Sequence, residues 1–291
     1  MRSAITNAMS VDVEDYFQVS AFEKHIPRAK WNELSSRVDT NTNRILDIFS
    51  EYNIKATFFT LGWVAEKSPS LVKRIVAEGH ELASHGYSHF RVIQQVEKEF
   101  REDIIRAKKL LEDLSGVSIK GYRAPSYSIG EKNIWALDVL CEEGHEYSSS
   151  IYPIKHDLYG MPNAPRFAHY YCNGKLLEIP ISTLEILGKK IPCGGGGFFR
   201  LYPYAVSKWA IQHVNKVDNQ PTVFYFHPWE IDPQQPRQSS ANMKSKFRHY
   251  LNLDRMESRI IRLLQDFNWD RIDKVFLETH AYSNILSAAK Q

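Results

Sequence analysis

Strand-like and helix-like segments alternate along nearly the whole of the 291-residue chain. Residues 55–61 form a short apolar run that is typical of a buried strand, whereas residues 40–52 carry apolar side chains at helical spacing. Strands that are joined through helices usually pair in parallel. The alternation therefore predicts an α/β fold with a parallel sheet, and the number of strands favours a barrel.

The boundaries of these segments follow from the apolar runs and from the residues that stop helices. The predicted strands are residues 10–13, 55–61, a run ending near His85, 120–123, 146–149, 176–181 and 222–227. The predicted helices are residues 40–52, 69–79, 96–114, 131–143, 203–214 and 255–267. With no low-complexity linker and no internal repeat between them, we expect a single domain with irregular insertions at residues 152–171 and 231–242.

Composition excludes several classes of protein. The chain is 43% hydrophobic, which suffices for a globular core, but no run of about 18 apolar residues exists to span a membrane. Residues 1–9 are too short and too polar for a secretory segment, and three widely spaced cysteines favour a reduced compartment, so we expect a cytoplasmic protein. A net charge of +3, dispersed over helical faces, gives no case for nucleic acid. No pattern in the chain defines an oligomeric state.

The polar side chains of interest follow the predicted strands at the point where each strand ends. They are Asp12, Glu14 and Asp15 after the first strand, His85 and His89 after the third, Arg123 after the fourth, and His227 after a late one. Because the carboxyl ends of parallel strands share one face of a barrel, these groups are expected to converge.

His85 and His89 lie four residues apart in a turn rich in Gly and Ser. Neutral imidazole is a common metal ligand, and two such rings with a carboxylate and a water make an open metal site. The spacing alone also fits two hydrogen-bonded or surface histidines.

Three acids close the first strand next to apolar neighbours. Burying Asp12, Glu14 and Asp15 without partners would be costly, so a metal ion or the guanidinium of Arg123 is their natural counterpart. The alternation of a strand places Asp12 and Glu14 on one face.

Two further features have both a structural and a functional interpretation. The glycine run 194–197 lacks the Lys-Ser/Thr of a phosphate-binding loop, which leaves a flexible lid or a close approach of backbone to a sugar. Aromatic residues such as Tyr127 and Trp229 either pack in the core or stack on sugar rings.

Taken in order, the motifs resemble those of polysaccharide deacetylases with a NodB-homology domain, also called carbohydrate esterase family four. The motifs are Ser10-Val11-Asp12-Val13-Glu14-Asp15, Ser84-His85-Gly86-Tyr87-Ser88-His89, Tyr122-Arg123-Ala124-Pro125-Ser126-Tyr127 and Phe226-His227. We expect a domain over residues 8–285, with the core motifs in 8–230 and a C-terminal extension in 231–285. The glycine run with Phe-Phe-Arg and the string His227-Pro228-Trp229-Glu230 look like a subgroup found with bacterial exopolysaccharide export loci.

This resemblance implies a distorted (β/α)7 barrel that removes N-acetyl groups from an amino-sugar polymer with the help of a divalent metal. Zn²⁺ is favoured, with Co²⁺, Ni²⁺ or Fe²⁺ as alternatives. The implied roles are Asp12 as general base, His227 as general acid, Arg123 as the partner of Asp12, His85 and His89 as metal ligands together with Glu14 or Asp15, and Pro125, Ser126, Tyr127 and Trp229 as substrate contacts.

The sequence departs from the family pattern in two places. The family usually has adjacent aspartates, whereas Asp12 is followed by Val13, and this leaves both Glu14 and Asp15 open as the third ligand. The family also often has an Asp that orients the acid histidine, and Ser148-Ser149-Ser150 stands in that region. The partner of His227 is therefore not defined.

Two other functions stay open. The same barrel could hydrolyse a cyclic amide or a formamide, for which a small closed pocket would be expected. A non-catalytic carbohydrate-binding protein on a decayed barrel is the other, although the joint presence of base, ligands and acid argues against it.

Overall fold

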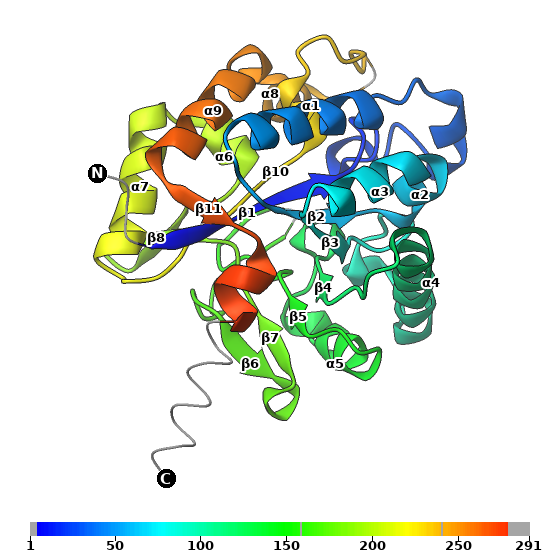
Figure 1. Ribbon diagram of the computed structural model, residues 1–291, viewed down its shortest axis with the longest axis horizontal. Coiled ribbons are helices and arrows are strands. Elements are labelled where there is room, and N and C mark those ends of the chain that lie inside the picture. Colours follow the sequence, from blue (N-terminus) through cyan, green and yellow to red (C-terminus); the bar gives the residue numbers. More distant parts are fainter. Residues whose placement is uncertain (1–4, 158, 240, 279–291) are drawn as a thin grey trace.

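The computed structural model describes residues 5–157, 159–239 and 241–278, which form one domain around a curled sheet (Figure 1). The strands are β1 (Thr6–Val13), β2 (Thr57–Thr60), β3 (Glu81–Ser84), β4 (Gly121–Tyr122), β5 (Tyr147–Ser148), β6 (His169–Tyr171), β7 (Leu176–Glu178), β8 (Thr183–Ile186), β9 (Lys189–Pro192), β10 (Val223–Phe226) and β11 (Asn268–Asp270). The main sheet has the order β10-β1-β2-β3-β4-β5-β7-β6, with β11 also paired to β1. Every pair from β10 to β7 is parallel, while β6 is antiparallel to β7 and β8 to β9.

Helices cover the outside of this sheet, as Figure 1 shows. The α-helices are α1 (Val38–Glu51), α2 (Gly62–Lys67), α3 (Pro69–Ala77), α4 (Glu97–Ser115), α5 (Trp135–Glu142), α6 (Gly196–Leu201), α7 (Tyr204–Lys216), α8 (Met243–Tyr250) and α9 (Met256–Asp266). The short helices are η1 (Ser20–Phe22), η2 (Arg28–Glu33), η3 (Val92–Gln94), η4 (Pro125–Tyr127), η5 (Glu131–Asn133), η6 (Cys172–Gly174), η7 (Pro228–Ile231), η8 (Leu253–Arg255) and η9 (Asp273–Glu278). Within the described residues, no helix is both long and apolar enough to cross a membrane.

The alternation of β1 decides which of its side chains reach the site. Met9, Val11 and Val13 belong to the apolar core under the helices, and all three are fully buried. Ala8 belongs to the second core, inside the barrel, and Asp12 has the same parity in the strand. The strand therefore carries Asp12 on its interior face, close to its carboxyl end.

The predicted fold class is confirmed: seven parallel strands curl into an incomplete barrel within one domain. Most predicted strands and helices lie within a few residues of the observed ones. The differences are short elements, namely α2, α6, α8, β6, β11 and the β8–β9 pair, which the sequence did not predict. The predicted C-terminal boundary at residue 285 lies outside the described residues.

The glycine run lies between β10 and the segment after β7, which are the two ends of the parallel sheet. The backbone N–H of Tyr225 donates to the carbonyl of Gly194 at 2.8 Å, and Gly195 forms a parallel bridge with Tyr225. A Cβ on Gly194 would lie 2.3 Å from the carbonyl oxygen of Val223. The expectation of a flexible lid is therefore wrong for Gly194, Gly195 and Gly196, which are buried and pack against β10 and the loop that follows it.

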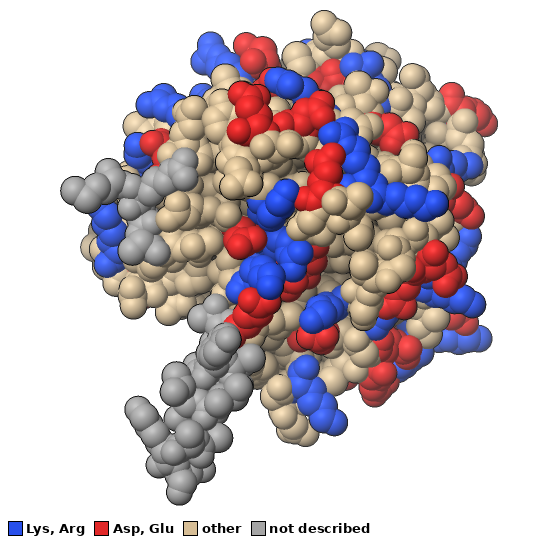
Figure 2. Space-filling view, viewed as in Figure 1, with Lys and Arg blue, Asp and Glu red and all other residues tan. Residues whose placement is uncertain are grey.

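Charged side chains of both signs are interspersed on the face shown in Figure 2. This agrees with the dispersed charge of the sequence, in which 37 basic and 34 acidic residues nearly balance.

We predict that Gly194→Ala destabilises the protein by about 1–3 kcal/mol, because the added methyl group has no space beside the backbone of β10. Gly197→Ala is the matched control, since nothing lies within 4 Å of a Cβ at that helical position. Denaturant unfolding of both variants measures the effect. Equal unfolding midpoints for the two variants would contradict this account of the packing around Gly194.

Candidate active site

A buried ion pair lies at the carboxyl end of β1. Arg123 follows β4 and is fully buried, and its Nη1 donates to Asp12 Oδ1 at 2.6 Å. The guanidinium also donates to Ser10 Oγ at 2.8 Å, and its central carbon lies 4.0 Å from the ring centroid of Phe59. With its donors satisfied, the charged pair is tolerated in the interior. The second oxygen of Asp12 accepts a hydrogen bond from Tyr127 at 3.3 Å, and Asp12 lines the cavity.

The serines that follow β5 support this arginine. Ser149 accepts from Arg123 through its carbonyl oxygen at 3.2 Å and its Oγ at 3.0 Å. Ser150 Oγ accepts from the backbone N–H of Ala124 at 3.0 Å. In the family pattern, this region supplies an Asp that orients the acid histidine. In this chain, the serines of the region orient Arg123 instead.

Glu14, His85 and His89 bring their side chains together next to Asp12. One potential ligand atom from each lies within 4.8 Å of the others, and all three residues are buried. His85 Nδ1 lies 2.7 Å from the carbonyl oxygen of Arg123, to which it donates, and this leaves Nε2 free to bind a metal.

The donor set fits a divalent metal. Glu14 Oε2 is buried, and its close polar contact is His89 Nε2 at 2.6 Å. A divalent cation bound by both atoms would satisfy this buried carboxylate. One carboxylate and two imidazoles that leave further positions open form the ligand set of a catalytic metal site.

Protonation states agree with this assignment. Burial lowers the pKa of His85 to about 4, and the field of His89 adds to the effect, so the ring is neutral near pH 7. Burial alone would raise the pKa of Glu14, but His89, His227 and His85 together hold it at about 2. Metal ligands must be a neutral imidazole and an ionised carboxylate, and both are present.

The loop that carries His89 is held in an unusual conformation. His89 has φ 54°, in the left-handed region that side chains other than glycine seldom adopt. Arg28 donates to the carbonyl oxygens of Ser88 at 2.9 Å and His89 at 2.8 Å, and the carboxylate of Asp103 accepts from the backbone N–H of Tyr87 at 2.8 Å. Such strain is typical of functional sites, and here the surroundings enforce it.

Asp15, the alternative third ligand, lies in a different environment. Its Oδ2 accepts from Ser36 Oγ at 2.7 Å and from the backbone N–H groups of Arg37 at 2.7 Å and Val38 at 3.1 Å. The carboxylate therefore caps the N-terminus of α1, whose free N–H groups need an acceptor. The structure does not bring Asp15 to the two histidines, whereas it does bring Glu14 there.

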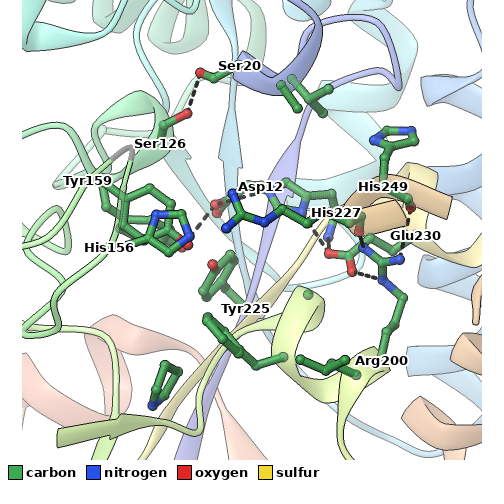
Figure 3. Close-up of a pocket in the computed structure, with 18 of the residues that line it drawn as sticks. Asp12, Ser20, Ser126, His156, Tyr159, Arg200, Tyr225, His227, Glu230 and His249 are labelled. Atoms are coloured by element: carbon green, nitrogen blue, oxygen red, sulfur yellow. Dashed lines mark hydrogen bonds and ion pairs between the residues drawn. The ribbon is translucent and has the colours of Figure 1, made fainter. Parts of the chain in front are cut away.

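His227 follows β10 directly, and its side chain has a partner that was not predicted from the sequence. Its Nδ1 donates to Glu230 Oε1 at 2.7 Å, and Glu230 Oε2 accepts from Arg200 Nε at 2.6 Å (Figure 3). Glu230 is fully buried and Arg200 nearly so. A Cβ on Gly196 would lie 2.3 Å from Glu230 Oε1, so the glycine makes room for the carboxylate. The signal in the sequence was a Glu three residues after His227 at the start of a short helix.

This arrangement leaves His227 Nε2 facing the cavity, 3.6 Å from Glu14 Oε1 and 3.9 Å from Asp12 Oδ2. Burial opposes the charge on the ring, but Glu14, Glu230 and Asp12 together raise the pKa of His227 to about 9. The imidazole is therefore protonated near neutral pH, as a general acid must be.

The structure places three of the four predicted substrate contacts at the cavity and the fourth away from it. Ser126, Tyr127 and Trp229 line a cavity of about 690 Å³, which Asp12, Glu14, His85, His89 and His227 also line. Trp229 stacks on His227 with ring centroids 5.0 Å apart, and its Nε1 donates to Glu14 Oε1 at 3.3 Å. Pro125 is buried at the start of η4 and does not line the cavity.

Comparison with known proteins agrees with the geometry. Residues 32–140 match the family described as polysaccharide deacetylase, and residues 149–277 match a family described as a domain of unknown function, DUF3473. Over residues 32–140 this match confirms the resemblance seen in the motifs. His85 and Arg123 lie in the first matched stretch and His227 in the second, while Asp12 and Glu14 precede both.

Curated relatives match mainly the first stretch. A peptidoglycan-N-acetylglucosamine deacetylase of Bacillus cereus is 43% identical over 98 residues, which are 33% of this chain and 36% of the relative. A peptidoglycan deacetylase of Helicobacter pylori is 33% identical over 37% of this chain and 36% of the relative. A chitooligosaccharide deacetylase of Sinorhizobium fredii is 31% identical over 34% of this chain and 44% of the relative. The chain thus spans less than half the length of each of these relatives.

Two solved structures show the same fold over nearly the whole chain. A Mycobacterium smegmatis protein described as a polysaccharide deacetylase has a TM-score of 0.62 at 18% identity, covering 97% of this chain and 92% of that one. Puue allantoinase has a TM-score of 0.59 at 15% identity, covering 96% and 91%. At these identities the likeness concerns the fold alone.

We predict that Glu14→Gln loses bound metal while Asp15→Asn keeps it. The neutral side-chain amide that replaces the Glu14 carboxylate is a poor ligand. Asp15 accepts hydrogen bonds at the N-terminus of α1 and from the backbone N–H of Tyr16, so its loss should cost about 1 kcal/mol of stability. Metal content by elemental analysis and the free energy of unfolding measure the two effects.

The double variant His85→Ala/His89→Ala should also lose the metal and remain folded. Metal loss in Asp15→Asn with retention in Glu14→Gln would reverse the assignment of the third ligand.

Proposed function

We propose that this protein hydrolyses N-acetyl groups on an amino-sugar glycan, giving acetate and a free amine in a metal-dependent reaction. The observation that carries the proposal is that three groups of side chains lie together at the bottom of one cavity. These are the Asp12–Arg123 pair, the donor set of Glu14 and the two histidines, and the protonated His227 with its buried carboxylate. The names of the curated relatives, which act on peptidoglycan and chitooligosaccharide, support an N-acetylated glycan as substrate.

Glu14, His85 and His89 would hold the divalent metal. When bound there, it would polarise the acetyl carbonyl and lower the pKa of a water molecule. Zn²⁺ suits one carboxylate and two imidazoles, and Co²⁺, Ni²⁺ and Fe²⁺ accept the same donors. Asp12 Oδ2 faces the same space and accepts the proton of the attacking water. Arg123 fixes the carboxylate through its other oxygen and supplies the countercharge.

The remaining steps, stabilisation of the oxyanion and protonation of the leaving group, use Ser126 and His227. The backbone N–H of Tyr127 donates to the carbonyl of Ala124, so we assign the developing oxyanion to the N–H of Ser126, which lines the cavity. His227 then donates the proton on Nε2 to the leaving nitrogen, because an amine departs far more readily than its anion. Glu230 keeps the proton on Nδ1 and thereby orients the ring, in the manner of a triad carboxylate.

A small cyclic amide or a formamide fits the cavity less well. The space of about 690 Å³ extends from Asp12 to the partly exposed side chains of α8, among them Phe247, which is 58% exposed. A site for a small substrate would enclose it, whereas a long open wall suits an oligomer. The glycine-run and His-Pro-Trp-Glu strings favour an exopolysaccharide as the polymer. Acetate release from an N-acetylglucosamine oligomer, lost on chelation and restored by metal, tests the proposal, and turnover of allantoin in place of it would reject it.

Replacing Asp12 by Asn should lower turnover by roughly 10²–10⁴-fold, the usual worth of a positioned general base. The amide oxygen can still accept from Arg123, and the metal ligands are unchanged, so folding and metal content should persist. Steady-state kinetics beside elemental analysis separates loss of the base from loss of the metal. Activity within a few-fold of the wild type would remove Asp12 from the role of base.

We predict that His227→Ala loses much more activity on an N-acetyl amide than on an O-acetyl ester of the same sugar. An alkoxide leaving group needs less help from a proton than an amine does. Rates of acetate release from the two substrates measure the difference. Equal losses on amide and ester would make His227 a binding residue.

Glu230→Gln should show the same selectivity in weaker form and should also shift the pH profile. Glu230 raises the pKa of His227, so its removal lowers that pKa. Because the acid acts only below its pKa, the basic limb of the amide profile should move to lower pH. An unshifted basic limb would show that Glu230 does not act through His227.

A further inference from the structure

The cavity has two walls of different electrostatic character. Its floor carries the three acids Asp12, Glu14 and Glu230, which face Arg123, the histidines and Arg200. Beyond the floor, the outer wall is built from the segment after β5, from β9, α6 and α8. Its charged side chains that line the cavity are Lys155, Lys190, Lys244 and Arg248.

Little negative charge balances these four cations. Asp157 accepts from Lys244 Nζ at 2.6 Å and from Arg248 Nη1 at 3.1 Å, so one carboxylate is shared between two cations. Lys190 Nζ donates to two backbone carbonyl oxygens, those of Pro162 at 2.8 Å and Ala164 at 2.7 Å, which carry no net charge. Lys155 is exposed and has no acidic partner among the described residues. The outer wall therefore carries three more positive than negative charges.

Aromatic side chains stand among these cations. Phe198, Tyr159 and Phe247 line the same wall, and the ring of Tyr159 stacks on His156 at 4.0 Å (Figure 3). Aromatic faces stack on the apolar faces of sugar rings, while neighbouring lysine and arginine bind anions attached to them. The combination suits a sugar ring that bears a negative charge.

The chemistry of the reaction strengthens the argument. Each deacetylation turns a neutral acetamide into a cationic amine, so a polymer of amino sugars alone would become increasingly repelled by a cationic wall. A polymer that also carries anions would remain attracted to it, because its own negative groups offset the new amines.

We propose that the substrate is an acidic glycan, and that the outer wall binds a carboxylate or phosphate on a residue next to the reacting N-acetyl sugar. This inference rests on the proposed deacetylation and specifies the class of its substrate. The anionic group lies on the side of Lys155, Lys190 and α8, while the acetamide lies over the floor.

The test compares three oligomers of equal length with the metal-loaded enzyme: neutral N-acetylglucosamine, N-acetylglucosamine alternating with glucuronic acid, and N-acetylglucosamine carrying a phosphate ester. We expect a KM at least about tenfold lower for an anionic oligomer, and a smaller difference at high ionic strength, since salt screens exposed charges. The carboxylate and phosphate arms identify which anion is preferred. Equal KM values for all three oligomers would overturn the proposal.

Two variants should move this preference in opposite directions. Lys155→Gln removes an exposed cation from the wall and should raise KM for the anionic oligomer several-fold, with kcat unchanged. Asp157→Asn frees Lys244 and Arg248 and should lower it. Lys73→Gln, an exposed lysine on α3 away from the cavity, is the matched control and should change nothing. Shifts of the same sign in both variants, or a shift in the control, would reject the subsite.

Failure of the deacetylation itself is a separate outcome. If no oligomer releases acetate, the proposed function falls. Binding of the glucuronic-acid oligomer to the wild type and to Lys155→Gln, measured by calorimetry, then decides the subsite independently. Salt-sensitive binding that Lys155→Gln weakens would support it, and no binding would overturn it.

Discussion

Arg123 is the residue on which the rest of the site depends. Its guanidinium is buried with Asp12 and joins the end of β1 to the segment after β5 through Ser149. Its backbone carbonyl accepts from His85 and so selects which imidazole nitrogen remains free for a metal. One residue therefore fixes both the carboxylate of Asp12 and the tautomer of His85. The cost of burying the charge is offset only because every partner is in place. Replacing one partner alone would leave a buried charged or polar group unpaired.

The positions of the functional groups could be predicted because they depend on strand ends. The parity of β1 placed Asp12 on the interior face, and Glu14 follows in the turn directly after the strand. The parallel order brought His85, Arg123 and His227 to the same edge. The choice between Glu14 and Asp15 could not be made from the sequence. It depends on the N-terminus of α1, whose free N–H groups take up Asp15, and that contact joins residues more than 20 positions apart.

The elements that were missed are those whose stability comes from contacts distant in sequence. α8 has only eight residues, and Arg200 donates to the carbonyl oxygens of His249 and Leu251 at its C-terminus. Short helices are marginal without such support, so periodicity alone does not reveal them. Glu230 differs from these elements, because its contact with His227 spans only three positions and could be predicted locally. The family pattern pointed instead to residues 148–150.

Arg200 also links two parts of the chain that are distant in sequence. It binds Glu230 on one side and the end of α8 on the other, so the proposed proton donor and the C-terminal region share one guanidinium. The stretch that matches the polysaccharide deacetylase family contains His85 and His89 but neither the first acids nor this arginine. In this chain that stretch alone therefore lacks part of the proposed site. Exchanging residues 32–140 alone would require a second half that supplies the missing carboxylates and the contacts of Arg200.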